Sequence, residues 1–151
     1  MFRQRLVDCF TQDWHRSITD SSRWYHYKHF KSLLNTERYL TLDLPVKERI
    51  SFARLRSSSH RFHIETGRYN TIPLQQRVCH FCLENGVMYI ECEYHVCFHC
   101  IRCVNTREQY LFNWYTSARN LENFYILLSC TDSSTIFKMA LFIDKLMTMA
   151  L

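Results

Sequence analysis

Cysteine and histidine are concentrated in one stretch of the sequence. Residues 79–103 read CHFCLENGVMYIECEYHVCFHCIRC and contain six cysteines and three histidines. Zn²⁺ binds four thiolate or imidazole ligands in a tetrahedron, and Cys79 and Cys82 have the C-x2-C spacing that lets two sulfurs reach one ion. Lone cysteines are usually inert core residues, but a cluster with this spacing indicates a site for one metal ion.

The second half of the site must come from later in the stretch, and spacing leaves three closures open. His95 with Cys100 would complete a Cys3His site. Cys97 with Cys100 would complete a four-cysteine site, and Cys100 with Cys103 would give the C-x2-C-x17-C-x2-C spacing of zinc ribbons. A turn at Asn85-Gly86 is expected to fold the chain back toward the ion.

Catalysis is not indicated by the residues. Cys97 and His99 are close in sequence, but catalytic Cys/His pairs are made by the fold and need an orienting partner that no motif supplies. The sequence has no Y-x-D-D-like polymerase motif and no carboxylate cluster typical of a nuclease. We therefore expect a protein that is not an enzyme. Cys9 and Cys130 stand alone, and core packing is expected for both.

The composition predicts a small helical domain. The 151 residues fit one domain, 47% hydrophobic residues exclude a disordered chain, and two glycines with two prolines are too few for a turn-rich β fold. No apolar run is long enough to span a bilayer, and the first residues lack the apolar core of a signal peptide. We expect an intracellular protein of the nucleus or cytoplasm with no membrane partner, where thiols bind metal more often than they form disulfides.

Positive charge is concentrated in the first half of the chain. Residues 1–78 contain fourteen Lys and Arg against seven Asp and Glu, whereas residues 79–151 contain five against seven. A surplus of this kind suits a polyanion such as a nucleic acid, although solvated faces also carry such charge.

Hydrophobic periodicity and capping residues place the elements. Helices are predicted over about residues 3–17, 37–42, 45–56, 108–115 and 121–128. A last helix contains apolar residues at three- and four-residue steps, namely Ile136, Met139, Ala140, Ile143, Met147 and Ala150. Asp132 or Ser133 is expected to cap it, with Asp144 and Lys145 on its polar side.

Two segments are less regular. Residues 21–30 fit either a helix or a strand, and we favour a helix. Residues 60–78 contain Gly67, Asn70 and Pro73, which predict an ordered loop. In the helix that begins at Pro45, the apolar residues Val46, Ile50, Ala53 and Leu55 are expected to face the core.

Several motifs resemble the tail that follows the polymerase in many animal non-LTR retrotransposon reverse transcriptases. In order along the chain, the motifs of such tails are R-x-S-x-H, I-E-x-G-R, R-x-C-x-x-C, E-D-E-x-H-F and C-P-x-Y. In this sequence residues 54–82 read RLRSSSHRFHIETGRYNTIPLQQRVCHFC, and residues 83–103 read LENGVMYIECEYHVCFHCIRC. The resemblance covers roughly residues 36–110 and is specific in order and spacing. It departs from the pattern at Cys92, Cys97, Ile101 and Cys103.

The resemblance implies one of the three closures. In that family the C-x-x-C pair, the histidine and the last cysteine resemble a zinc knuckle that grips nucleic acid, so the implied Zn²⁺ ligands are Cys79, Cys82, His95 and Cys100. The implied fold is a mainly α domain with a zinc-knuckle-like C-x2-C...H-x4-C insertion and little β structure. Its expected parts are an N-terminal helical segment (1–35), the tail-like core (36–110) and C-terminal helices packed on that core (111–151).

The expected partner is RNA or single-stranded DNA. Arginine binds phosphate oxygens in pairs, and the candidate contacts in the basic segment are Arg54, Arg56, His60, Arg61, Arg68 and Arg77. Tyr69, Phe62 or Phe81 could stack on unpaired bases, and Arg56 and Arg68 could instead be structural. The function expected is a zinc-stabilised, non-catalytic nucleic-acid-binding accessory domain. The alternative is a structural or protein-interaction zinc domain.

Overall fold

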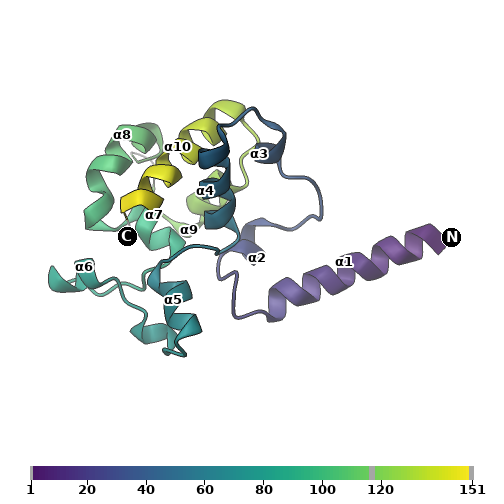
Figure 1. Cartoon of the computed structure of the whole chain (residues 1–151), viewed down its shortest axis with the longest axis horizontal. Helices are drawn as coiled ribbons and strands as arrows, with labels where there is room; N and C mark the ends of the chain where they lie inside the picture. The colour runs from purple at the N-terminus through teal and green to yellow at the C-terminus, as the bar shows by residue number, and fades with distance from the viewer. Residues whose placement is uncertain (1, 116–117, 150–151) are drawn as a thin grey trace.

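The structure is a computed structural model that describes residues 2–115 and 118–149. Within these residues the chain forms ten α-helices and two short 3-10 helices, and its β structure is one isolated bridge between Val78 and Ile90. Figure 1 shows the helices gathered into one body from which the first helix projects. The prediction of a small, mainly α protein with little β structure is confirmed.

The element bounds are as follows. In chain order they are α1 (Phe2–Asp20), α2 (Tyr27–Phe30), α3 (Arg38–Thr41), α4 (Val46–Arg56), α5 (His63–Tyr69), η1 (Leu74–Gln76), α6 (His80–Glu84), α7 (Glu93–Phe98), η2 (Ile101–Cys103), α8 (Val104–Tyr115), α9 (Leu121–Leu128) and α10 (Ser133–Met149). The predicted helix over residues 121–128 has the bounds of α9.

Helix α10 is the centre of the core, and it packs against α4 and α8. Its Ile136, Met139 and Ile143 are buried as predicted, whereas Ala150 lies outside the described residues. The Asp132 carboxylate accepts a 2.8 Å hydrogen bond from the backbone N–H of Thr135, which satisfies a donor at the start of the helix. The cap predicted at this end is therefore present.

Asp144 was assigned to the polar side of this helix, and that prediction is wrong. The side chain is buried, where its Oδ1 accepts a 3.0 Å hydrogen bond from the Ser51 hydroxyl and its Oδ2 lies 3.0 Å from Lys47 Nζ. Buried carboxylates need such partners. Lys47 and Ser51 both lie on α4, so this contact ties α4 to α10.

The core-facing side of α4 also differs from the prediction. Val46 is 68% exposed and Ile50 is 45% exposed, whereas Phe52 and Leu55 are buried. The face that packs on α10 includes Ser51, whose polarity is explained by its hydrogen bond to Asp144. Apolar periodicity found only Leu55 of this face because two of its buried positions, Ser51 and Arg56, are polar.

The loop predicted for residues 60–78 contains α5 and η1. Gly67 lies inside α5, where a Cβ atom would come within 2.7 Å of Arg77 Cγ. The glycine therefore permits the close approach of another segment and does not mark a break in the helix. In residues 21–30 the helix is limited to Tyr27–Phe30, and the six residues before it form turns, bends and irregular backbone.

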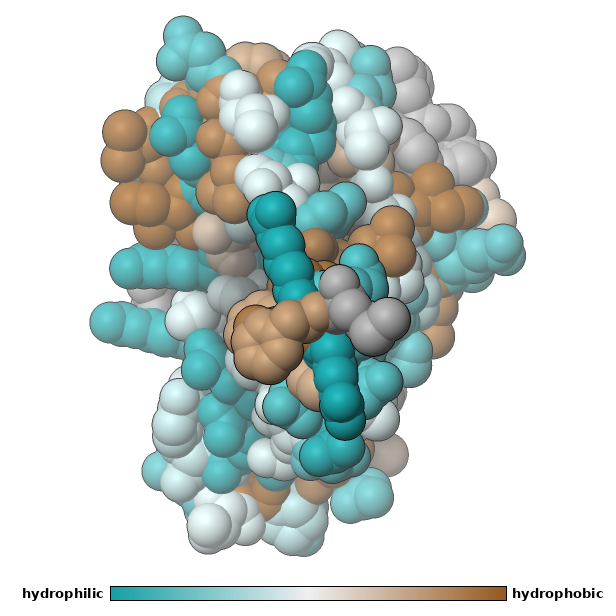
Figure 2. All heavy atoms as spheres, turned by 90° about the vertical axis from the view of Figure 1, so that its right-hand side faces the viewer, coloured by the Kyte–Doolittle hydropathy of each residue, from teal (hydrophilic) through white to brown (hydrophobic). Residues whose placement is uncertain are grey.

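Helix α1 extends beyond both predicted ends and leaves much of its length in solvent. Ile18 is buried, but Phe2, Leu6 and Phe10 are more than half exposed, and Cys9 is exposed instead of packed in the core. Figure 2, which faces the side toward which this helix projects, shows hydrophobic and hydrophilic side chains next to each other. The other lone cysteine, Cys130, is half-buried.

No single helix in the described part of the chain has both the length and the apolar character needed to cross a membrane. Taken together, α9 and α10 have the length and the apolar composition of a membrane-spanning segment. They are bent by 107° at the break between them.

Candidate metal centre

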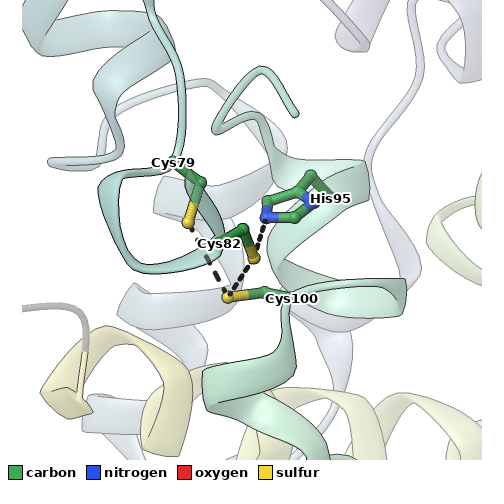
Figure 3. Close-up of side chains that lie close together, drawn as sticks. All are labelled: Cys79, Cys82, His95 and Cys100. Atoms are coloured by element: carbon green, nitrogen blue, oxygen red, sulfur yellow. Dashed lines mark hydrogen bonds between the residues drawn. The ribbon is translucent and has the colours of Figure 1, made fainter. Parts of the chain in front are cut away.

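Four side chains of the cysteine stretch converge on one point. One potential ligand atom from each of Cys79, Cys82, His95 and Cys100 lies within 4.8 Å of the other three, and all four residues are buried (Figure 3). Of the three closures that spacing left open, the structure brings together the Cys3His set. These residues could hold a metal ion.

The distances between these atoms fit a tetrahedral ion. The Cys100 sulfur is 3.9 Å from the sulfurs of Cys79 and Cys82, and the Cys82 sulfur is 3.4 Å from His95 Nε2. Zn–S bonds of about 2.3 Å at a tetrahedral angle place two sulfurs about 3.8 Å apart, and a sulfur and a nitrogen about 3.6 Å apart. Three edges of the site therefore have the lengths that zinc requires.

A short hairpin-like return positions the first two ligands. Cys79 is the last residue before α6 and Cys82 lies in its first turn, so both sulfurs leave the same end of the helix. Gly86, at a φ of +80°, then turns the chain, and the N–H of Val87 donates to the Cys82 carbonyl at 2.9 Å. The predicted turn at Asn85-Gly86 is confirmed, and it directly follows α6.

The bridge between Val78 and Ile90 brings this turn back to α7. The Cys79 N–H donates to the Tyr89 carbonyl at 2.8 Å, on one side of the bridge. On the other side, the Glu91 N–H donates to the Arg77 carbonyl at 2.9 Å. Since α7 starts at Glu93, the bridge sets the position of the helix that carries His95.

The end of α7 turns Cys100 toward the other ligands. The N–H groups of both His99 and Cys100 donate to the His95 carbonyl, at 2.8 and 2.7 Å, which terminates the helix. The buried Arg107 guanidinium donates to the carbonyls of Val96, Cys97 and Cys100, at 3.3, 3.2 and 2.7 Å. It also places a positive charge beside a cluster that would carry three thiolates.

Burial holds the metal-free ligands in their neutral forms. It raises the pKa of the Cys79 thiol to about 12, and it also raises the pKa of Cys82. The Cys100 pKa is raised by a hydrogen bond to Cys103 and by burial. Burial, with His99 and Arg107 nearby, lowers the pKa of His95 to about 4. At neutral pH the imidazole is ready to bind, whereas the thiols need a cation to displace their protons.

The three remaining cysteines of the stretch lie outside the cluster. Cys92, Cys97 and Cys103 are buried, and burial raises the pKa of Cys92 to about 12. Among the described residues, the four-ligand set is the group of histidine, cysteine and carboxylate side chains that meets closely enough for a metal ion.

Arg56 was predicted to contact phosphate, and its position contradicts that role. The residue is 5% exposed, its Nη2 is 2.8 Å from Glu37 Oε2, and it donates to the Leu128 carbonyl. Its guanidinium carbon lies 4.7 Å from the ring centre of Phe30 and 5.6 Å from that of Phe52. The structural role considered for Arg56 is the one that the structure supports.

Two further arginines of the basic segment have internal partners. Arg68 donates through Nε and Nη2 to Glu65 Oε2, at 3.1 and 2.9 Å, the pairing anticipated from the sequence. Arg77 donates to the carbonyls of Ile72 and Ile64, at 2.8 and 3.1 Å. Neither guanidinium is freely available for a phosphate.

The other predicted contacts border a groove of about 410 Å³. Its lining consists of Arg23, Arg54, Ser58, Ser59, His60, Arg61, Phe62, Tyr69 and Met147. Arg54 and Arg61 are exposed, and the lining drawn from the described residues includes no carboxylate. Arg23 was missed because it lies far earlier in the chain, and only its own positive charge could have suggested it.

The three aromatic residues considered for base stacking lie in different environments. Phe62 is buried, Phe81 is partly exposed on α6, and Tyr69 is 69% exposed beside the groove. The Arg68 guanidinium carbon lies 4.4 Å from the Tyr69 ring centre. Tyr69 therefore has one face supported by a cation, next to the exposed arginines.

Comparison of the chain with protein-family models, with curated proteins and with solved structures finds no match. The resemblance to retrotransposon tails remains a prediction from the order and spacing of the motifs.

Proposed function

We propose that the chain is a zinc-stabilised, non-catalytic accessory domain that binds RNA or single-stranded DNA. The observation that carries the proposal is the groove beside α4 and the α4–α5 connection, which Arg23, Arg54 and Arg61 all line. Arginine forks bind phosphate oxygens in pairs, and such contacts give affinity without reading sequence.

The proposed metal is Zn²⁺, held by Cys79, Cys82, His95 and Cys100. Three thiolates and one imidazole are soft and borderline donors that suit zinc, and a closed four-ligand set is typical of a structural site. The domain is proposed to act inside the cell, in the nucleus or cytoplasm, without a membrane.

Unpaired nucleic acid is favoured over duplex because of Tyr69. An exposed ring beside phosphate-binding arginines can stack on a base only where that base is not already paired and stacked in a helix. This arrangement and the motif order together support an origin in the tail of a retrotransposon reverse transcriptase.

Fluorescence anisotropy with labelled single-stranded RNA, single-stranded DNA and duplex DNA tests this proposal. We expect affinity for the single strands to fall steeply between low and high salt, because phosphate contacts release counterions. The double variant Arg54→Glu/Arg61→Glu should lose most of the affinity, whereas Lys138→Glu, an exposed charge reversal on α10, should lose little. Affinity that does not change with salt would reject the proposal.

The alternative, a structural or protein-interaction zinc domain, is favoured by one observation. Phe2, Leu6 and Phe10 of α1 are exposed, and exposed apolar side chains of this size often mark a protein contact. A metal-loaded chain that binds no oligonucleotide at low salt would favour this alternative.

A further inference from the structure

Glu93 is a buried carboxylate at the first position of α7, two residues before His95. It is 2% exposed, and its Oε1 accepts a 2.7 Å hydrogen bond from the Ser58 hydroxyl and lies 2.9 Å from His60 Nε2. Its Oε2 lies 4.0 Å from Nε2 of His26. One side chain thus contacts three residues from two distant segments.

Those segments carry the arginines of the groove. Ser58 and His60 line the groove themselves, between Arg54 on α4 and Arg61. Ser58 has a φ of +51°, a backbone conformation that a non-glycine residue adopts only when its surroundings hold it there. Two contacts are made by Ser58 itself: its hydroxyl donates to Glu93, and its backbone N–H donates to the Leu55 carbonyl at 3.3 Å.

The third arginine is connected to Glu93 through His26. His26 is buried, and its Nδ1 lies 3.1 Å from the Tyr125 hydroxyl on α9, so the ring is held between α7 and α9. Arg23 lies three residues earlier, in the turns that lead into α2. His26 therefore places the segment that carries Arg23 beside α7 and α9, with its Nε2 4.0 Å from Glu93 Oε2 and no hydrogen bond between the two atoms.

The other end of the connection is the metal centre. Helix α7 has six residues, a length at which a helix is not stable without tertiary contacts. His95 lies in its first turn, and Cys100 follows its end. An ion held by these two residues and by the pair beside α6 would fix the position of α7 and therefore the position of the Glu93 carboxylate.

We propose that Glu93 is a positioning residue that couples the metal centre to the basic groove, so that metal binding orders the groove. The inference rests on the proposed function, because it concerns the same groove and the same ion. Glu93 itself touches neither the ion nor the nucleic acid. By linkage, a nucleic acid bound in the groove must tighten metal binding by the factor by which the metal tightens nucleic-acid binding.

The test compares the wild-type chain with Glu93→Gln and with the control Glu84→Gln. Glu84 lies on α6 close to the metal ligands but is exposed, so the control makes the same change in charge without touching the groove. Zn²⁺ affinity is measured by competition with a chromophoric chelator, with and without a short single-stranded oligouridylate. Hydrogen exchange is measured for the amides of residues 54–62, with α10 as the reference for global folding.

In the wild type and in Glu84→Gln we expect oligouridylate to tighten Zn²⁺ binding by on the order of tenfold. In Glu93→Gln we expect one zinc per chain and protected α10 amides, but a coupling factor near one and faster exchange over residues 54–62. Coupling and protection that remain at wild-type levels in Glu93→Gln would overturn the inference. So would a Glu93→Gln chain that loses both its zinc and the protection of its α10 amides.

Hydrogen exchange separates this inference from the proposed function. If no oligonucleotide binds to the zinc-loaded wild type, the proposed function fails. In that case, zinc-bound Glu93→Gln with faster exchange over residues 54–62 still supports the coupling, and unchanged exchange overturns it.

Discussion

The metal centre and the basic groove are built in opposite ways. The metal centre takes all its ligands from residues 79–100 and buries them, and burial keeps its metal-free thiols protonated. The groove collects arginines from residues 23, 54 and 61 and leaves Arg54 and Arg61 exposed. The first region is a buried set of side chains that could hold an ion, whereas the second leaves two arginines exposed to solvent.

This difference separates two kinds of perturbation. Changes in the metal centre should act on folding, because ligands that cannot bind an ion leave short helices and buried polar groups without support. Changes at exposed groove positions should act on binding and leave folding almost unaltered.

Replacing a metal ligand should have the largest effect. For Cys82→Ser and for His95→Ala we expect loss of the bound metal, and of folding free energy that reaches about 10 kcal/mol for structural zinc sites. Metal content and circular dichroism measure the outcome. Cys97→Ser is the matched control, because Cys97 is buried in the same stretch and lies outside the cluster. Full metal occupancy in both ligand variants would refute the site.

The two regions should also respond differently to pH. Since the thiols of Cys79, Cys82 and Cys100 have raised pKa values, they are protonated at neutral pH in the metal-free chain, and each releases a proton on binding. His95, with a pKa of about 4, is already neutral at this pH and releases no proton when it binds the metal. Metal affinity should therefore rise with pH between about 6 and 8, by about 4 kcal/mol per unit for three protons.

Calorimetry in buffers of different ionisation enthalpy measures this proton release. Oligonucleotide affinity of the zinc-loaded chain should change little over the same range, because arginine keeps its charge. Release of no more than about one proton per metal ion would contradict a three-thiol ligand set.

Two arginines of α4 should show the same contrast within one helix. Arg56→Ala removes a buried guanidinium that binds Glu37 and the Leu128 carbonyl. Because Glu37 keeps Lys31 as a second partner, we expect a loss of stability of about 1 to 3 kcal/mol. Arg54→Ala, two residues earlier and exposed, should change stability by less than about 0.5 kcal/mol. Urea unfolding of zinc-loaded protein measures both changes. Equal losses of stability would show that burial does not distinguish these arginines.

Much of the metal centre was predictable because its geometry is local. The C-x2-C spacing at Cys79 and Cys82 places two sulfurs at the same end of α6 whatever surrounds them, and the Asn85-Gly86 turn follows from glycine's access to positive φ. The choice of His95 and Cys100 came from the family resemblance, because spacing alone fitted three closures equally well.

The roles of the arginines were less predictable. Arg54 and Arg56 are two residues apart with the same charge, yet one is exposed and the other lies among Phe30, Tyr39 and Phe52. A long, flexible side chain follows the nearest carboxylate, carbonyl or ring, and those groups come from other segments. The groove residue Arg23 was missed for the same reason.

The residue types and short-range spacing in this chain were enough to determine a helical protein with a C-x2-C metal pair, a turn at Gly86 and a capped last helix. Tertiary structure alone decided which arginines face solvent, why Asp144 and Glu93 can be buried, and that Glu93 of α7 contacts Ser58 and His60 of the groove. Local dihedral preferences and ligand spacing act within a few residues. The cost of burying a charge is settled by partners that the fold brings from elsewhere in the chain.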